Sequence, residues 1–261
     1  MGEFALYWRY VRLWLISESQ YKGWAIRLAL TLLVTATDPL DAALLLDRFG
    51  SVGGMGAAGI LLVYSIAVSA FGFAELFARG FDLFPNLVKG GELDRVLLRP
   101  RGLFVQVSAL RFHLNRASRA FGMLALAIYL IRAQGVAIGI RELALLLFAV
   151  AGGAATYIGI FALAAAASIF TIESPDWIYV FTNGSYQAAK VPIGLLPDWL
   201  RRTFLYVAPM FAFCHYPAAS ICRWEGAGAA GLYALPAGAA FLALSMAAWR
   251  AAVRRYRGAG S

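Results

Sequence analysis

The chain has 261 residues, of which 61% are hydrophobic and 14% are charged, and its formal net charge is +9. An average soluble domain has roughly 25% charged residues, so this composition indicates an integral membrane protein. The apolar runs are long enough for membrane helices, and the alternating runs of about ten residues that mark an outer-membrane barrel are missing, which predicts an all-α fold. Basic residues collect in the cytoplasmic loops of membrane proteins, so the positive charge does not indicate a nucleic-acid partner.

Residues 1–20 mix aromatic and aliphatic side chains with Arg9 and Arg12. This mixture predicts an amphipathic helix that lies in the headgroup layer, and an irregular cytoplasmic tail is the alternative. Charged residues also interrupt the apolar region that a cleavable signal peptide would need. We therefore expect this segment to stay in the mature protein as an interfacial helix.

Five later segments approach the length of a membrane span, because about 20 helical residues cross a hydrocarbon core of ~30 Å. They are residues 24–46, 56–77, a segment centred on 120–131, 143–170 and 231–249. The third is too short alone, so it must extend over Arg116 and Arg119 or over Arg132 and Gln134. Tryptophan near a span end favours the membrane interface, which is the place expected for Trp249.

The region between the fourth and the last of these segments decides the topology. It holds two apolar stretches, 177–191 and 204–221, and the two chain ends lie on opposite sides if both cross. If 177–191 crosses and 204–222 is a re-entrant hairpin on the outer side, sixteen Lys and Arg residues lie inside and seven outside. The positive-inside rule favours this arrangement, which has six spans and both termini in the cytoplasm. Pro209 and Pro217 are the predicted breakers of the re-entrant segment.

The sequence shows no linker, repeat or nucleotide motif. Residues 1–257 are therefore predicted to form a single transmembrane domain, followed by a tail or cloning remnant at 258–261. A P-loop needs a Lys followed by Ser or Thr, whereas Lys22, Lys89 and Lys190 precede Gly, Gly and Val. This chain is thus expected not to be an enzyme itself and to bind no cofactor. His113 and His215 are far apart and have no further ligands at recognisable spacing, which predicts no metal site.

Residues 90–100 form a short charged stretch between the second and third spans. Gly90 and Gly91 allow a sharp turn, and Pro100 cannot continue a helix regularly. Between them the sequence predicts a short helix with acidic residues in its first turn and a basic residue in its last, as the helix dipole prefers. Its residues are Glu92, Leu93, Asp94, Arg95, Val96, Leu97, Leu98 and Arg99. The apolar face exceeds what a two-turn surface helix needs, so either a partner's groove takes the excess or the helix merely connects two spans at headgroup level.

The order Gly-Glu-Leu-Asp-Arg-Val-Leu-Leu-Arg-Pro after an apolar span resembles the ABC-2 family of ABC transporter permeases, in the branch with a G-x-L-D-x-x-L-L-R-P signature. The segments Val207-Ala208-Pro209 and His215-Tyr216-Pro217-Ala218 resemble the later region of the same branch, in which a hydrophobic-Pro pair precedes Tyr-Pro-Ala. Six spans after an interfacial helix fit the same family over nearly the whole chain. The first span departs from the pattern, because Asp38-Pro39-Leu40-Asp41 is more polar than expected there.

The resemblance implies a complex of two permease subunits, identical or related, with two cytoplasmic ATPase subunits that bind ATP and Mg. Residues 92–99 would be the coupling helix seated in a groove of the ATPase, with Gly90, Gly91 and Pro100 as its hinge. The complex would lie in the bacterial cytoplasmic membrane, surrounded by lipid, and would export a substrate. Fold analogy alone implies a lipid-like or amphipathic substrate.

Asp38 and Asp41 form a candidate intramembrane polar site near the outer end of the first span. An ionisable group inside a membrane indicates function by default, although Asp-Pro is also an ordinary turn signal. A proton-coupled secondary carrier that uses these carboxylates is therefore the alternative to the exporter. A non-transporting membrane scaffold, with the short helix as a docking tag, is a third.

Overall fold

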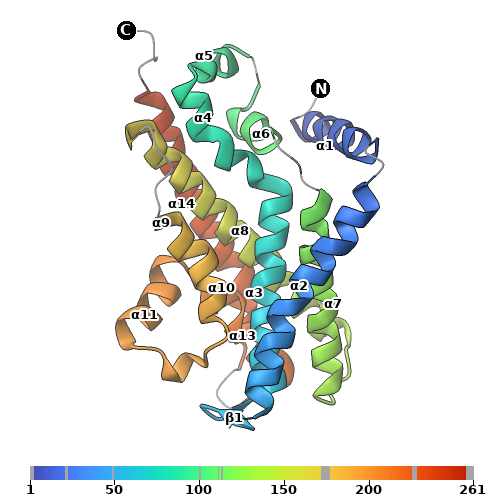
Figure 1. Cartoon of the computed structure of the whole chain (residues 1–261). Coiled ribbons are helices and arrows are strands. Elements are labelled where there is room, and N and C mark those ends of the chain that lie inside the picture. Colours follow the sequence, from blue (N-terminus) through green and yellow to red (C-terminus); the bar gives the residue numbers. More distant parts are fainter. Residues whose placement is uncertain are drawn as a thin grey trace.

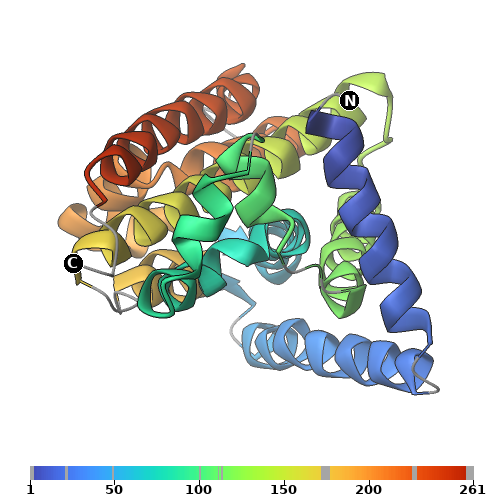
Figure 2. The same ribbon diagram turned by 90° about the horizontal axis from the view of Figure 1, so that it is seen from above.

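The computed structural model describes residues 3–20, 23–48, 50–99, 101–110, 112, 114–171, 177–224 and 228–256. Within them the chain is almost wholly helical, and the long helices run along one common direction (Figure 1). The N-terminal helix α1 (Glu3–Ser19) lies across one end of this bundle (Figures 1 and 2). The same end carries α4 (Phe84–Lys89), α5 (Glu92–Leu97), α6 (Leu103–Ser108) and the last turns of α14 (Ala234–Arg254).

Residues 3–19 form helix α1, one face of which packs on the bundle, and its place in the headgroup layer stays a prediction. Val11 is buried against Leu76 and Phe112, and the Tyr7 hydroxyl donates a hydrogen bond to the Phe77 carbonyl oxygen at 2.9 Å. Burial raises the pKa of the Tyr7 phenol above its usual value. The opposite face exposes Leu13 and other large apolar side chains. A helix with one face on the bundle and an apolar face outward fits a position at the membrane surface.

The first two long helices are α2 (Trp24–Asp47) and α3 (Ala57–Ala78), and a short antiparallel hairpin joins them. Its strands are β1 (Ser51–Val52) and β2 (Met55–Gly56). Helix α3 is apolar on all sides and almost every residue is buried, which is what a helix at the centre of a bundle requires. Helix α2 instead stands at the edge of the bundle, where it packs on α7 (Leu114–Ala133) and α3 (Figure 2).

The 3₁₀ helix η1 (Arg79–Leu83) continues α3 into α4. Phe81 and Phe84 pack edge-to-face on the indole of Trp249, with ring centroids 5.5 and 6.0 Å apart. Trp249 is only 1% exposed, so its indole is buried among protein side chains, and its position at the depth of the membrane interface stays a prediction. Trp249 is buried because aromatic rings of η1, α4 and α6 pack around its indole. The short helices at this end are thereby anchored to α14.

Helix α8 (Ile140–Thr171) packs against α14 over most of their lengths, and the 3₁₀ helix η5 (Ala230–Tyr233) leads into α14. Glycines make this contact close. A Cβ atom placed on Gly238 would lie 2.0 Å from the carbonyl oxygen of Gly152. Helices in a membrane lack a hydrophobic force between them, so small residues that let backbones approach stabilise such pairs.

The region between α8 and α14 consists of short pieces. They are α9 (Trp177–Tyr179), the π-helical turn η2 (Val180–Gly184), α10 (Ser185–Ala188), η3 (Ile193–Leu195), α11 (Asp198–Arg202), the π-helical turn η4 (Thr203–Val207), α12 (Met210–Phe213) and α13 (His215–Cys222). A bend of 68° separates Asp198–Val207 from Met210–Cys222. Figure 1 shows α11 in the half of the molecule that is remote from α5.

Three of the described helices are long and apolar enough to cross a membrane, namely Ala57–Lys89, Ile140–Thr171 and Ala230–Arg254, and the bent pair would make a fourth. A multi-pass, all-α membrane protein is therefore confirmed. The crossing of α2, α7 and the α9–α10 segment, and with it the count of six, stays a prediction. Helix α7 runs from Leu114 to Ala133, so it contains Arg116 and Arg119 and also Arg132.

Candidate functional site

The predicted coupling helix is α5, and a glycine pair separates it from α4. Gly91 has φ = 66°, in the left-handed region, whereas Gly90 has φ = −82°, which any residue adopts. Glu92 and Asp94 lie in the first turn of α5, where their negative charges interact favourably with the positive end of the helix dipole. Pro100, the third predicted hinge residue, lies outside the described residues.

One face of helix α5 is buried against the bundle, and the opposite face is exposed. Leu93 is fully buried and Val96 is 6% exposed, and the helix contacts α4 and α6. Leu98 is 84% exposed, just past the C-terminal end of α5. The other exposed members of the predicted coupling segment are Glu92, Asp94, Arg95, Leu97 and Arg99. The structure therefore supplies both an anchor and a free surface that mixes apolar and charged groups.

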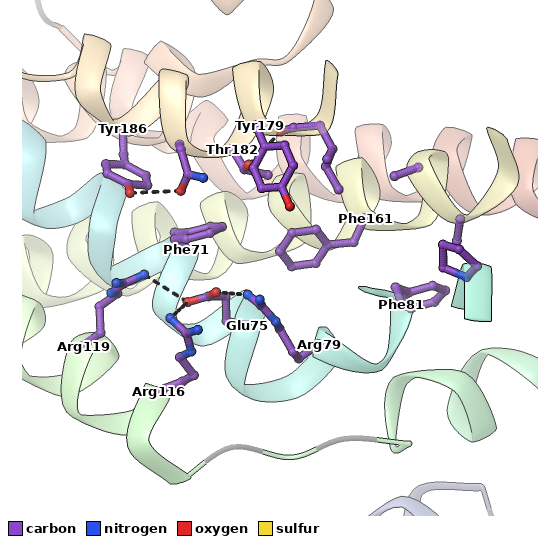
Figure 3. Close-up of a pocket in the computed structure, with 15 residues that line it drawn as sticks. Phe71, Glu75, Arg79, Phe81, Arg116, Arg119, Phe161, Tyr179, Thr182 and Tyr186 are labelled. Atoms are coloured by element: carbon purple, nitrogen blue, oxygen red, sulfur yellow. Dashed lines mark hydrogen bonds and ion pairs between the residues drawn. The ribbon is translucent and has the colours of Figure 1, made fainter. Parts of the chain in front are cut away.

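A cluster of charged side chains lies inside the same half of the bundle. Glu75, in the last turn of α3, is 1% exposed. Its Oε2 atom accepts hydrogen bonds from Nη1 of Arg116 and of Arg119, each at 3.1 Å, and its Oε1 atom pairs with Arg79 (Figure 3). Charges at membrane depth are costly unless they are paired, which explains why the arginines of α7 meet a carboxylate of α3.

The cluster borders a cavity of about 290 Å³ between α3, α7, α8 and the α9–α10 segment. Figure 3 shows Tyr179, Thr182 and Tyr186 on the side opposite the arginines, with Phe71 and Phe161 between the two sides. Among the described residues that line it, three are arginines and one is a carboxylate, so their formal charges sum to +2. A cleft lined by one sign of charge attracts ions of the opposite sign, here anions.

The predicted intramembrane site is only partly assembled. Asp38 accepts a hydrogen bond from the Tyr64 hydroxyl at 3.2 Å, and Nζ of Lys190 lies 4.8 Å from the centroid of the Tyr64 ring. Both Asp38 and Asp41 are exposed on α2, at the edge of the bundle. The structure thus gives Asp38 a partner on α3, while Asp41 faces outward.

The two predicted breakers differ in position. Pro209 precedes α12 and lies at the 68° bend, whereas Pro217 is buried in the first turn of α13, where a helix tolerates proline. His215 is half-buried beside them and packs on Trp224. In the described part of the chain, no three His, Cys, Asp or Glu side chains gather where a metal ion could bind. His113 lies outside the described residues.

A family profile described as "ABC-2 family transporter protein" matches residues 32–260. The chain belongs to the ABC-2 family. Neither the curated proteins nor the solved structures yielded a match. As an ABC-2 family member, the chain is a permease component of an ABC transporter, a multi-pass membrane subunit that associates with an ABC ATPase. The narrower G-x-L-D-x-x-L-L-R-P branch stays a prediction.

Sequence reasoning about this ABC-2 permease missed the charged cavity. The sequence analysis considered Arg116 and Arg119 only as possible extensions of the third span. A signal was present, because Glu75 is a lone carboxylate near the end of an otherwise uncharged span and an intramembrane charge indicates a nearby partner. The spacing of Arg116 and Arg119, three residues apart, also places them on one helix face.

Proposed function

We propose that the chain is the permease subunit of an ABC exporter that moves an amphipathic, lipid-like substrate across the bacterial cytoplasmic membrane. The observation that carries the proposal is the form of α5, which is anchored through Leu93 and Val96 and exposes Leu98 at the end of the bundle. ATP and Mg would bind to a separate ATPase subunit. Two such subunits would join two permeases, which are identical or related.

In this proposal α5 is the coupling helix and seats in a groove of the ATPase. Closure of the ATPase pair would displace α5, and α4 and η1 would pass the movement to α3, because these helices follow one another along the chain. A bundle with two alternative packings could turn the displacement into alternating access or lateral opening. Helix α1 and the end of α14 lie at the α5 end, which supports both termini being cytoplasmic (Figure 1).

The contact between Asp38 and Tyr64 keeps a proton-coupled carrier as the second candidate. In that mechanism the Asp38 carboxylate would take up and release a proton at the outer half of the membrane. Transport that follows the proton gradient without an ATPase, and that stops in Asp38→Asn, would favour the carrier. Transport that needs ATP and continues in Asp38→Asn would favour the exporter.

The sharpest test changes the free surface of α5. The full chain is co-expressed with an ABC ATPase subunit, and co-purification and ATP hydrolysis are measured. Leu98→Asp should weaken assembly about tenfold to a hundredfold, since burial of a leucine in a partner's groove contributes about 1.5–3 kcal/mol. Ile140→Asp is the matched control, because Ile140 is 90% exposed at the remote end of α8. Equal ATPase recovery from both variants would refute the assignment of α5.

A further inference from the structure

The charged cavity beside Glu75 is built like a binding site for an anion. The guanidinium groups of Arg79, Arg116 and Arg119 surround the Glu75 carboxylate, and all four side chains line the cavity. The side chains of Arg79, Arg116 and Arg119 keep 28%, 26% and 25% of their surface exposed, while Glu75 keeps 2%. The positive groups therefore face the open space, and the negative group lies behind them.

The remaining walls suit the body of an amphiphile. Phe71, Phe161, Ala164 and Ala165 give the cavity an apolar side. Neutral hydrogen-bonding groups lie on the side opposite the arginines, where the Tyr186 hydroxyl donates to Oδ1 of Asn183 at 3.0 Å. The volume of about 290 Å³ is at the small end of ligand pockets, which span roughly 300–1,000 Å³. A head group fits this space, whereas a whole lipid does not.

We propose that this cavity binds the phosphate or carboxylate head group of an anionic amphiphile. The inference deepens the proposed function, because such a molecule is a substrate class for the exporter. The alternative source of the same chemistry is a resident anionic lipid of the surrounding leaflet. In both cases the arginines bind the head group, and Glu75 is the internal anion with which it competes.

Competition with Glu75 distinguishes a binding site from a purely structural ion-pair cluster. Glu75→Gln keeps the shape of the side chain and removes its charge, so the three arginines would attract an external anion more strongly. Arg119→Gln removes one of the groups that hold the head group. A binding site therefore predicts opposite changes in affinity for the two variants. A structural cluster predicts that both variants lose stability and that neither changes anion affinity.

The experiment measures binding of dodecyl phosphate to the full chain in dodecyl maltoside micelles. Dodecylphosphocholine is the comparison, because its phosphate carries a compensating cation. Wild type should bind dodecyl phosphate at least about tenfold more tightly, as expected for a charge-assisted hydrogen bond. Arg119→Gln should remove that preference, Glu75→Gln should increase it, and Arg132→Gln, an exposed change on the same helix α7, should leave it intact.

Two further arms separate the sources of the ligand. Stimulation of ATP hydrolysis by dodecyl phosphate in the permease–ATPase complex would identify a transported substrate. Co-purification of phosphatidylglycerol with wild type but not with Arg119→Gln, without stimulation, would identify a resident lipid. Equal binding of the two dodecyl compounds by wild type would overturn the proposal, even if a variant failed to fold. The binding assay needs no ATPase, so this failure is distinct from a failure to assemble with one.

Discussion

The two glycines before α5 differ in backbone conformation, and alanine substitution at each can measure how much that conformation contributes to the stability of α5. A Cβ atom on Gly91 would meet nothing within 4 Å, but φ = 66° is a left-handed conformation that costs an alanine about 1–2 kcal/mol. Gly90 has an ordinary φ, and its Cβ atom would lie 3.2 Å from the Asn86 carbonyl oxygen, which needs only a small shift. Gly91→Ala should therefore destabilise α5 more than Gly90→Ala does.

The strain at Gly91 competes with the burial that holds α5 on the bundle. Leu93 and Val96 are buried, and each contributes about 1.5–3 kcal/mol. Because this total exceeds a strain of about 1–2 kcal/mol, α5 should stay seated in Gly91→Ala. The population in which α5 is released should nevertheless rise about 5- to 30-fold. Leu93→Ala removes the anchor itself, at a cost of about 2–5 kcal/mol, and should release α5 further.

Limited trypsin digestion measures this release, because cleavage after Arg95 requires the helix to open. When opening is fast relative to cleavage, the rate tracks the population of the open form. The cleavage rate should increase in the order wild type, Gly90→Ala, Gly91→Ala and Leu93→Ala. Equal rates for the two glycine variants would refute the conformational reasoning, and Gly91→Ala cleaved as fast as Leu93→Ala would refute the energy balance.

Two other changes probe the packing of α8. Gly238→Ala would bring a methyl group to 2.0 Å from the Gly152 carbonyl oxygen, so thermal unfolding in detergent should show a loss of about 1–3 kcal/mol, whereas Gly194→Ala meets nothing within 4 Å and should be neutral. Equal melting of these two variants would contradict the close approach of α8 and α14. Tyr157→Phe removes the 2.9 Å hydrogen bond to Ser185 Oγ inside the bundle and should cost about 1 kcal/mol in the same assay. An unchanged melting temperature there would mean that this bond contributes nothing.

The sequence predicted the long helices well, because a long apolar run defines its own ends. Residues 24–46 and 56–77 correspond to Trp24–Asp47 and Ala57–Ala78. Sequence reasoning could not choose the limits of the third span, since arginines bound it on both sides. Helix α7 includes Arg132 as well as Arg116 and Arg119, and the latter two pair with a carboxylate on another helix.

The short pieces between α8 and α14 were beyond prediction for a different reason. Two π-helical turns, η2 and η4, interrupt the apolar stretches, and no propensity of single residues specifies such turns. Pro209 lies at the 68° bend, as expected of a residue that removes a backbone donor and crowds the preceding turn, while the re-entrant course of the segment stays a prediction. The candidate site likewise has one part that the sequence predicted and one part that it did not. Local chemistry predicted α5, whereas the cavity requires side chains from several helices.

Helix α5, the proposed coupling helix, is joined to the cavity through η1 and α4, and this connection bears on how nucleotide state could change affinity for an anion. Glu75 lies in the last turn of α3, Arg79 begins η1, and α4 leads from there to α5. Phe81 lines the cavity and also packs on Trp249, so η1 contacts both the cavity and α14. A displacement of α5 would therefore reach the ion pair of Glu75 and Arg79 before it reached the remote half of the bundle. Since one carboxylate holds three arginines, a small movement of that carboxylate changes the charge that the cavity presents to a head group.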